Sequence, residues 1–277
     1  MYEGERIFYT AYQTFSKTTV TSAISYGKFS SLLNEFRRQQ FALISLKENA
    51  ELRIHKGKNS AESWTGNYVR EGFLYIPHKG IFLVKNSPIN DHVNQADDAN
   101  MMGFEYGITM EDAEKALQDS VHIPYDTQEI AIEDLPDNPI AGFAFGEAVA
   151  EYALFLKEAD ITKWPIWIIP KGLVDTQPHP FVRQVIFRCM DNWSGIIGSN
   201  ADLHRPYGVR AISYHYKGRI DDRDEVYSLA DILNALKAAS LSGLEGIVLR
   251  ALRQSSSLPV NYAQEPFSWG SGQSQGS

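Results

Sequence analysis

Short apolar runs bounded by turn residues constrain the fold of this chain more than any other feature. Residues 73–76 (FLYI) and 81–84 (IFLV) flank the turn sequence PHKG, and two short strands around a Pro-first, Gly-last turn form a hairpin. Residues 41–46 (FALISL) and 164–170 (WPIWIIP) have the length and apolar character of buried strands. These runs predict a sheet in the first third of the chain and a buried strand further along.

Alternation of apolar and polar residues predicts further strands. In residues 50–55, Ala50, Leu52 and Ile54 alternate with three polar side chains, which indicates a half-buried strand with its polar side outward. Strand-like patterns also cover residues 6–15, 18–26, 129–134 and 207–217.

Helical signals are strongest outside these segments. Residues 28–40 place four large apolar side chains on one helical face. Thr109 followed by Asp112 resembles a capping box at the start of a helix. Residues 139–160 and 180–193 also have helical character. The expected fold class is α+β, with an antiparallel sheet in the N-terminal third packed with helices from the middle and C-terminal parts.

Charge divides the chain into three parts. Residues 1–87 contain 12 Lys or Arg and 7 Asp or Glu, residues 88–180 contain 4 and 18, and residues 181–277 contain 10 and 9. Residues 254–277 have little to bury, so we expect a disordered tail there. We therefore expect one α+β domain over residues 1–253, made of a basic β-rich part (1–87), an acidic helical part (88–180) and a mixed part (181–253).

The cysteine content and the apolar segments predict the cellular compartment. A single cysteine, Cys189, excludes an intrachain disulfide and a cysteine-rich zinc module. The first residues lack the basic patch and apolar run of a secretory signal. The most apolar segment, 139–160, is interrupted by Glu147 and Glu151, which favours a buried helix over a membrane span. These features predict a soluble, cytoplasmic, intracellular protein without a membrane partner.

No standard catalytic or phosphate-binding motif occurs in the sequence. Glycine-rich phosphate loops and the G-x-S-x-G elbow are absent, and Ser194 has no acid–base arrangement beside it. His92 lies near Asp91, Asp97 and Asp98, but their spacing does not put the four ligands on one helical face. We expect no enzyme activity, no cofactor and no metal ion. An enzyme of unrecognised type around residues 91–98 remains an alternative.

Residues 51–86 concentrate positive charge and flat rings in a chain whose formal net charge is -8. The stretch carries six Lys or Arg, two His and five aromatic residues beside three acids. Single-strand binding needs cations that follow the phosphates and rings on which bases stack. We therefore expect a non-catalytic single-stranded DNA-binding protein. The expected phosphate contacts are Arg53, Lys56, Lys58, Arg70, Lys79 and Lys85, and the expected stacking rings are Trp64, Tyr68 and Tyr75.

In size and layout the chain resembles the single-stranded-DNA-binding proteins that bacteriophages encode for replication or transcription. The resemblance is carried by the basic aromatic region 1–87, the acidic helical region after it and the Gly/Ser/Gln tail 270–277. It implies a flexible tail that contacts replication or transcription partners and is frequently acidic. This tail departs from that pattern, because nothing after Glu265 is acidic, although Phe267 and Trp269 could anchor a partner.

The expected partners are single-stranded nucleic acid and a polymerase or another replication or transcription protein. The tail or the acidic middle part would contact that protein, and a homo-oligomer is also compatible with the sequence. An alternative is a structural or assembly protein that binds no nucleic acid. In that case the 139–160 helix, the 164–170 strand and the surface aromatic residues would serve subunit contacts.

Overall fold

The computed structural model describes residues 7–13, 19–125, 129–190, 195–198, 203 and 208–215. Contacts along the chain divide it into two compact units, Met1–Lys217 and Gly218–Ser277, and every described residue belongs to the first. The expected domain end at residue 253, the tail 254–277 and Ser194 lie outside the described residues.

Helices and strands are interspersed along the described chain, which confirms the α+β class. The strands are β1 (Phe8–Gln13), β2 (Thr19–Tyr26), β3 (Ala42–Leu43), β4 (Asn67–Ile76), β5 (Gly80–Val84), β6 (Tyr106–Gly107), β7 (Ser120–Ile123), β8 (Glu129–Ala131), β9 (Lys163–Trp167), β10 (Phe181–Phe187), β11 (Ile196–Ile197) and β12 (Gly208–His215). The α-helices are α1 (Phe29–Arg38), α2 (Leu46–Lys56), α3 (Val93–Met101), α4 (Met110–Leu117), α5 (Pro139–Phe145), α6 (Val149–Glu158) and α7 (Lys171–Val174). The 3-10 helices are η1 (Pro88–Asn90), η2 (Ile132–Asp137) and η3 (Gly146–Ala148).

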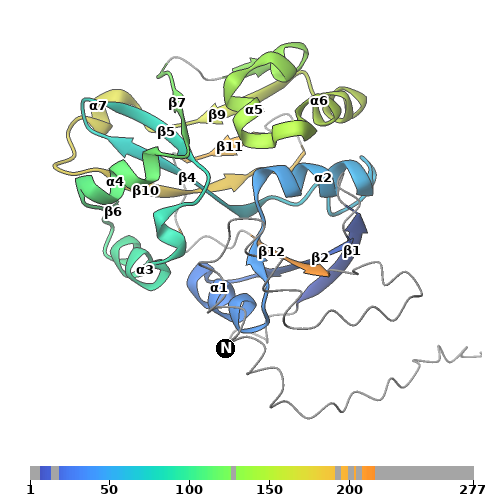
Figure 1. The fold of residues 1–277 in the computed structure, drawn as a ribbon, viewed down its shortest axis with the longest axis horizontal. Helices are drawn as coiled ribbons and strands as arrows, with labels where there is room; N and C mark the ends of the chain where they lie inside the picture. The colour runs from blue at the N-terminus through green and yellow to red at the C-terminus, as the bar shows by residue number, and fades with distance from the viewer. Residues whose placement is uncertain are drawn as a thin grey trace, which may run out of the picture. The chain divides into compact units, whose positions relative to one another are not determined.

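The described strands form one mixed sheet whose main path is β1-β2-β12-β4-β10-β11-β9-β8. Strand β3 also pairs with β12, β6 with β10, and β5 with both β4 and β7. Most pairings are antiparallel, whereas β12 pairs with β4 and β11 with β9 in parallel. The sheet is therefore built from the whole described chain, with β12 and β10 on either side of β4 (Figure 1).

Strand β4 lies between two hydrophobic cores. Val69, Phe73 and Tyr75 belong to one core, which also takes side chains from α2, α5 and α6. Tyr68 and Leu74 belong to the other, which takes side chains from α1 and α3. A strand covered on both faces reads as a continuous apolar run because neither set of alternate side chains meets water. This explains the unbroken FLYI run at the end of β4.

Several expected elements are confirmed. Helix α1 falls within residues 28–40 and buries its four large apolar side chains. Strands β1, β2 and β12 fall within the expected segments 6–15, 18–26 and 207–217, and β4 and β5 form the expected hairpin. Helix α4 begins after Thr109, whose side chain accepts a hydrogen bond from the Asp112 backbone N–H at 3.1 Å.

Residues 50–55, expected as a strand, belong instead to helix α2. The helix begins at a capping box, in which Ser45 Oγ accepts from the Glu48 N–H at 3.2 Å and Glu48 Oε2 accepts from the Ser45 N–H at 2.7 Å. Six alternating residues are too few to separate a strand from a helix, and the cap just before them decides the outcome. The neighbouring expected strand, 41–46, is reduced to the two residues of β3.

Residues 180–193, expected as a helix, contain strand β10 instead. Six of the seven residues of β10 are buried, because β10 pairs with β4 and its faces contribute to both cores. Continuous burial removes the period that distinguishes a strand from a helix. The expected 139–160 helix is broken into α5, η3 and α6 at Gly146, whose φ is 56°. This stretch is long and apolar enough to cross a membrane, and half of it is buried in the fold.

Candidate binding site at the N-terminal sheet

The two tyrosines expected to stack on bases are buried instead. Tyr68 and Tyr75 each have 0% of their surface exposed. The Tyr68 ring packs on Phe29 with its centroid 4.8 Å away, and the Tyr75 ring stacks on Phe181 at 4.8 Å with an interplanar angle of 6°. Because both faces of β4 are covered, neither ring can reach a base in this fold, and these two assignments are wrong.

Arg53 is also inside the protein, with 0% of its surface exposed. Its Nη1 donates to the Tyr152 hydroxyl at 3.1 Å, and its Nη2 donates to the carbonyls of Thr65, at 3.3 Å, and of Arg188. Its guanidinium carbon lies 3.9 Å from the centroid of the Phe187 ring. The expected phosphate contact is wrong because residue 53 belongs to a helix whose inner face packs against β10 and α6.

Three other expected phosphate contacts, Lys56, Arg70 and Lys85, are partly buried. Lys85 Nζ donates to the Phe143 carbonyl and lies 4.4 Å from the centroid of the Phe143 ring. Burial lowers the pKa of Lys85 below its usual range. The Nε atom of Arg70 is buried too. Lys85 therefore ties β5 to α5 rather than projecting into solvent.

The remaining three, Lys58, Trp64 and Lys79, are exposed. Trp64 is 44% exposed, and its Nε1 donates to the Lys58 carbonyl at 2.6 Å. Lys79 lies in the turn after β4, whereas Trp64 lies in the loop before it. A ten-residue strand spans about 33 Å at roughly 3.3 Å per residue, so the two positions are at opposite ends of β4. Of the nine predicted residues, the structure leaves Lys56, Lys58 and Trp64 together in one segment.

A pocket of about 340 Å³ lies next to this segment, between the loop 57–66 and the strands β1, β2 and β12. Sheet register places Phe8, Ile24 and Arg210 in one row across the three strands. Phe8 is 57% exposed and Tyr26 is 47% exposed. The residues that line the pocket are Phe8, Thr10, Ser22, Ile24, Tyr26, Ala61, Glu62, Thr65 and Arg210.

Two charged side chains line this pocket. Arg210 is 1% exposed, its Nη1 donates to Ser22 Oγ at 3.4 Å, and its Nε has no hydrogen-bond partner among the residues that the structure describes. Burial, reinforced by the nearby charge of Arg53, lowers the pKa of Arg210 to about 10, so the guanidinium stays protonated at neutral pH. Hydrogen bonds from Ser60 and, at 3.2 Å, from Thr10 hold the pKa of the Glu62 carboxyl below its usual range.

Sequence reasoning missed Phe8, Tyr26 and Arg210 as candidate site residues. One sequence feature could have indicated Arg210: it is a charged residue in the middle of a predicted strand, and its neighbours Val209, Ala211 and Ile212 are apolar. An arginine on a strand that is central in the sheet must be buried, and a buried charge needs a partner. The position of β12 between β2 and β4 was not visible in the sequence.

A second hollow, of about 790 Å³, lies between the segment around η1, β6 and α4, and Asp91, His92, Asp112 and His179 are among its lining residues. Asp97 is not part of it, because its buried carboxylate accepts from the Ser30 hydroxyl and lies 3.1 Å from Lys28 Nζ. Among the described residues, no group of three or more His, Cys, Asp or Glu side chains is placed to hold a metal ion.

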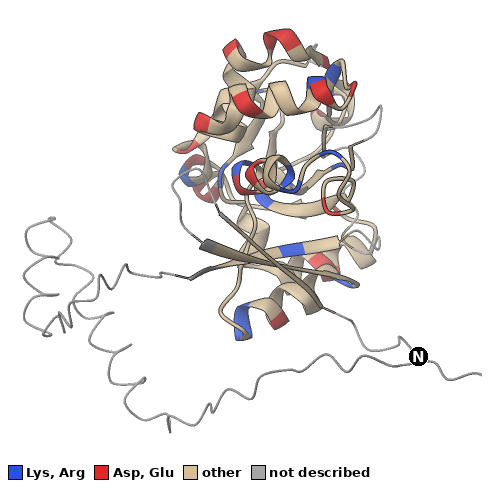
Figure 2. Ribbon diagram, turned by 90° about the vertical axis from the view of Figure 1, so that its right-hand side faces the viewer, with Lys and Arg blue, Asp and Glu red and all other residues tan. Residues whose placement is uncertain are grey.

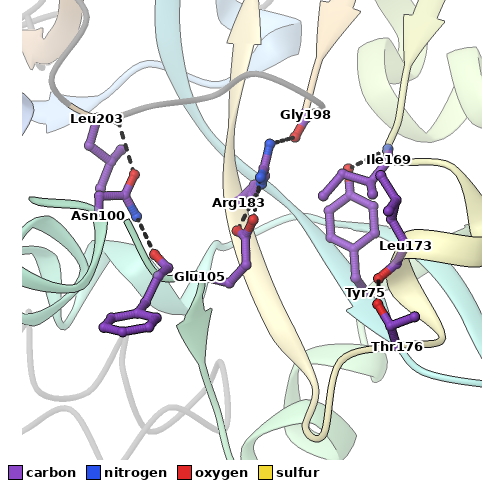
Figure 3. A network of polar contacts seen from close by, with 10 residues as sticks. Tyr75, Asn100, Glu105, Ile169, Leu173, Thr176, Arg183, Gly198 and Leu203 are labelled. Atoms are coloured by element: carbon purple, nitrogen blue, oxygen red, sulfur yellow. Dashed lines mark hydrogen bonds and ion pairs between the residues drawn. The ribbon is translucent and has the colours of Figure 1, made fainter. Parts of the chain in front are cut away.

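The segment after α3 is tied to β10 by a polar network (Figure 3). Arg183 Nε donates to Glu105 Oε2 at 2.8 Å, and Arg183 Nη1 donates to the Gly198 carbonyl at 3.3 Å. Asn100 Oδ1 accepts from the Leu203 N–H at 3.3 Å. Glu105, which belongs to the acidic middle part, is thus neutralised by a contact that stabilises the fold.

Comparison with known proteins adds a fold but no family. No protein-family model matches the chain, and no curated protein matches it. The chain is similar to a solved structure described as "Accommodation of massive sequence variation in Nanoarchaeota by the C-type lectin fold", with a TM-score of 0.51 and 13% sequence identity. The similarity covers 77% of this chain and 98% of that one. At this level of identity the likeness shows the fold alone, and the fold of this chain is similar to the C-type lectin fold.

Proposed function

We propose that the protein is a non-catalytic binding protein that takes single-stranded nucleic acid at the N-terminal sheet, beside the loop 57–66. The observation that carries the proposal is the exposure of Phe8, Tyr26 and Trp64 by about half of their surface in the part of the chain that has a surplus of positive charge. Exposed rings beside cations suit stacked bases and their phosphates. Lys56 at the end of α2 and Lys58 in the loop supply cations beside these rings, and Lys58 Nζ also donates to the Glu158 carbonyl.

The charge distribution supports this location. Strands β1 and β2 contain no acidic residue, whereas Figure 2 shows Asp and Glu on several helices of the upper half of the molecule. Repulsion by the acidic side chains of those helices would confine a polyanion to the N-terminal sheet and the loop 57–66. The description of the structural neighbour says that its C-type lectin fold accommodates massive sequence variation. A binding function carried by surface side chains is consistent with such a scaffold, since function belongs to a site and not to a fold.

The test is fluorescence anisotropy of labelled single-stranded and duplex oligonucleotides, titrated with the full chain at several salt concentrations. We expect preferential single-strand binding that weakens with salt, with a slope that reports the number of phosphates neutralised. Trp64→Ala removes one stacking ring and should weaken binding by about 1–3 kcal/mol.

Phe104→Ala is the matched control, because Phe104 is an exposed ring in the acidic part of the chain. Its affinity for the single strand should equal that of the unmodified chain. Absence of binding at low salt, or equal losses in both variants, would overturn the proposal.

A second candidate, a protein-interaction or assembly function, is favoured by a different surface. Met101, Met102, Phe104 and Met110 are all exposed around the end of α3 and the start of α4. Exposed methionines and aromatic rings are typical of protein-binding surfaces. Light scattering tests this candidate: a mass above that of one chain, reduced by Met102→Lys, would support it.

A further inference from the structure

The pocket lined by Phe8, Tyr26, Glu62 and Arg210 contains a buried cation without a bound counter-charge. No carboxylate of the described residues lies within ion-pair distance of Arg210, and Ser22 is the hydrogen-bond partner of its guanidinium, with Nε left unpaired. A buried charge is costly unless it is paired and hydrogen-bonded. The charge of Glu62, in the same pocket, acts on Arg210 without forming an ion pair, so a bound anion would complete the pairing of the guanidinium.

Arg53 shows that this is not a general property of buried arginines in this fold. The Arg53 guanidinium bonds to a hydroxyl and two carbonyls and rests on the Phe187 ring. Arg210 lines a pocket instead, and its planar fork of donors suits a phosphate or a carboxylate. Both guanidinium groups are buried, but Arg53 uses its donors within the core, whereas Arg210 lies in the wall of a pocket.

The other walls of the pocket restrict the rest of the ligand. Phe8 is an exposed ring at one end of the row that leads to Arg210, and Tyr26 is an exposed ring two residues beyond Ile24 on β2. Glu62 accepts from Thr10 at Oε1 and from Ser60 at Oε2, and a carboxylate has about four lone-pair positions, so it can accept from a further donor. The ligand should therefore combine an anionic group, a flat ring and N–H donors on the ring.

We infer that this pocket binds a nucleotide, with its phosphate at Arg210, its base against Phe8 and Tyr26, and the N–H groups of the base at Glu62. Guanine fits best, because it presents two adjacent donors on one edge to a carboxylate. The volume of about 340 Å³ is at the small end of the range for ligand pockets, about 300–1,000 Å³. The nucleotide is either free or one unit of a single strand, and only the second source rests on the proposed function.

The test titrates the full chain with dGMP, dTMP and inorganic phosphate by calorimetry. In parallel, anisotropy follows a labelled dT strand about eight nucleotides long, with or without one central dG. We expect dGMP to bind more tightly than dTMP, phosphate to compete with both, and the central dG to strengthen strand binding.

Arg210→Met should lower the dGMP affinity at least tenfold, and it should not unfold the protein because it replaces an unpaired buried charge with an apolar side chain. Thermal unfolding of the variant checks this. Glu62→Gln should remove the preference for dGMP over dTMP while phosphate still competes. Lys163→Met, a charge removed at an exposed position on β9, is the control and should leave every titration unchanged.

The two failures are distinguishable. Strand binding that is unaffected by Arg210→Met and indifferent to the central dG would overturn the nucleotide pocket and leave the proposed function intact. Binding of dGMP through Arg210 without any strand binding would support the pocket and overturn the proposed function. Absence of binding by all probes would overturn both.

Discussion

Tyr75 on β4 and Phe181 on β10 form a stacked pair, with ring centroids 4.8 Å apart and planes 6° from parallel. The Tyr75 hydroxyl accepts a hydrogen bond from the Ile169 N–H at 3.4 Å. The pair therefore joins two adjacent strands and the segment after β9. Tyr75 does stack on a flat partner, as the sequence suggested, but that partner is another side chain of the same chain.

Tyr75→Ala should destabilise the protein by about 3–5 kcal/mol, because it leaves a large cavity in the core. Tyr75→Phe should cost about 1 kcal/mol, since only the bond to the Ile169 N–H is lost. Urea unfolding measures both. If Tyr75→Ala weakened oligonucleotide binding while its unfolding midpoint stayed unchanged, the buried position of this ring would be incorrect.

Glu71 predicts a pH dependence of stability. Its side chain is fully buried on β4, and burial raises its pKa to about 7, against the lowering effect of Arg70 and of the Leu46 N–H. The folded state then binds more protons than the unfolded state between about pH 4.5 and 7, so the free energy of unfolding falls as pH rises through that window. Relative to Glu71→Gln, the unmodified chain should lose up to about 3 kcal/mol between pH 4.5 and 8.

Urea unfolding at several pH values measures this difference. Glu51, whose pKa is also raised to about 7 by burial, should keep part of the pH dependence in the Glu71→Gln variant. Glu114→Gln, at an exposed position on α4, is the matched control and should follow the unmodified chain. If the free energy of unfolding changed with pH in the same way in the unmodified chain, Glu71→Gln and Glu114→Gln, the pH dependence would not come from Glu71.

The cap of α2 should be measurable as well. Ser45→Ala removes the side chain that accepts from the Glu48 N–H and should lower the free energy of unfolding by about 1 kcal/mol. Glu48→Gln keeps an oxygen for the Ser45 N–H and should be closer to neutral. Chemical denaturation of both variants measures which one loses more free energy of unfolding. A larger loss in Glu48→Gln than in Ser45→Ala would show that the charge of Glu48, and not the cap, stabilises the helix.

Two glycines should respond in opposite directions to alanine. Gly142 lies inside α5 with nothing within 4 Å of an added Cβ, so Gly142→Ala should stabilise the protein by about 0.5–1 kcal/mol. At Gly198 an added Cβ would lie 2.1 Å from the Phe73 ring, so Gly198→Ala should destabilise it by about 1–3 kcal/mol or more. Thermal unfolding of the two variants measures the change in melting temperature. Equal changes in both variants would contradict the close contact at Gly198.

The sequence predicted local structure well where one face of an element meets water. Helix α1 buries one stripe of side chains and leaves Arg37 and Arg38 exposed, so its period is visible. Prediction from the sequence failed where burial is continuous, as in β10. It also failed in residues 50–55, where a short segment fits both the strand period and the helix period. At the latter, the capping residues just upstream were the stronger signal.

The candidate site was less predictable than the fold class. The sequence indicated the end of the chain at which the candidate pocket lies, since Lys58 and Trp64 are exposed next to it, but it could not show that Tyr68 lies under α1. A ring in a strand is a surface or a core residue depending on what covers the sheet. Arg210 lies 146 positions after Trp64 in the sequence, and only the order of the strands brings it next to the loop 57–66.

The place of β12 between β2 and β4 also sets an order of events during synthesis. Residues 19–26 and 67–76 emerge early, yet their shared neighbour is residues 208–215. Until that late segment arrives, β2 has an open edge along its length, and β4 has one at Asn67 and Tyr68, where other chains can pair. We expect folding of the nascent chain to be delayed, and chains that stop before residue 208 to need chaperones or to aggregate.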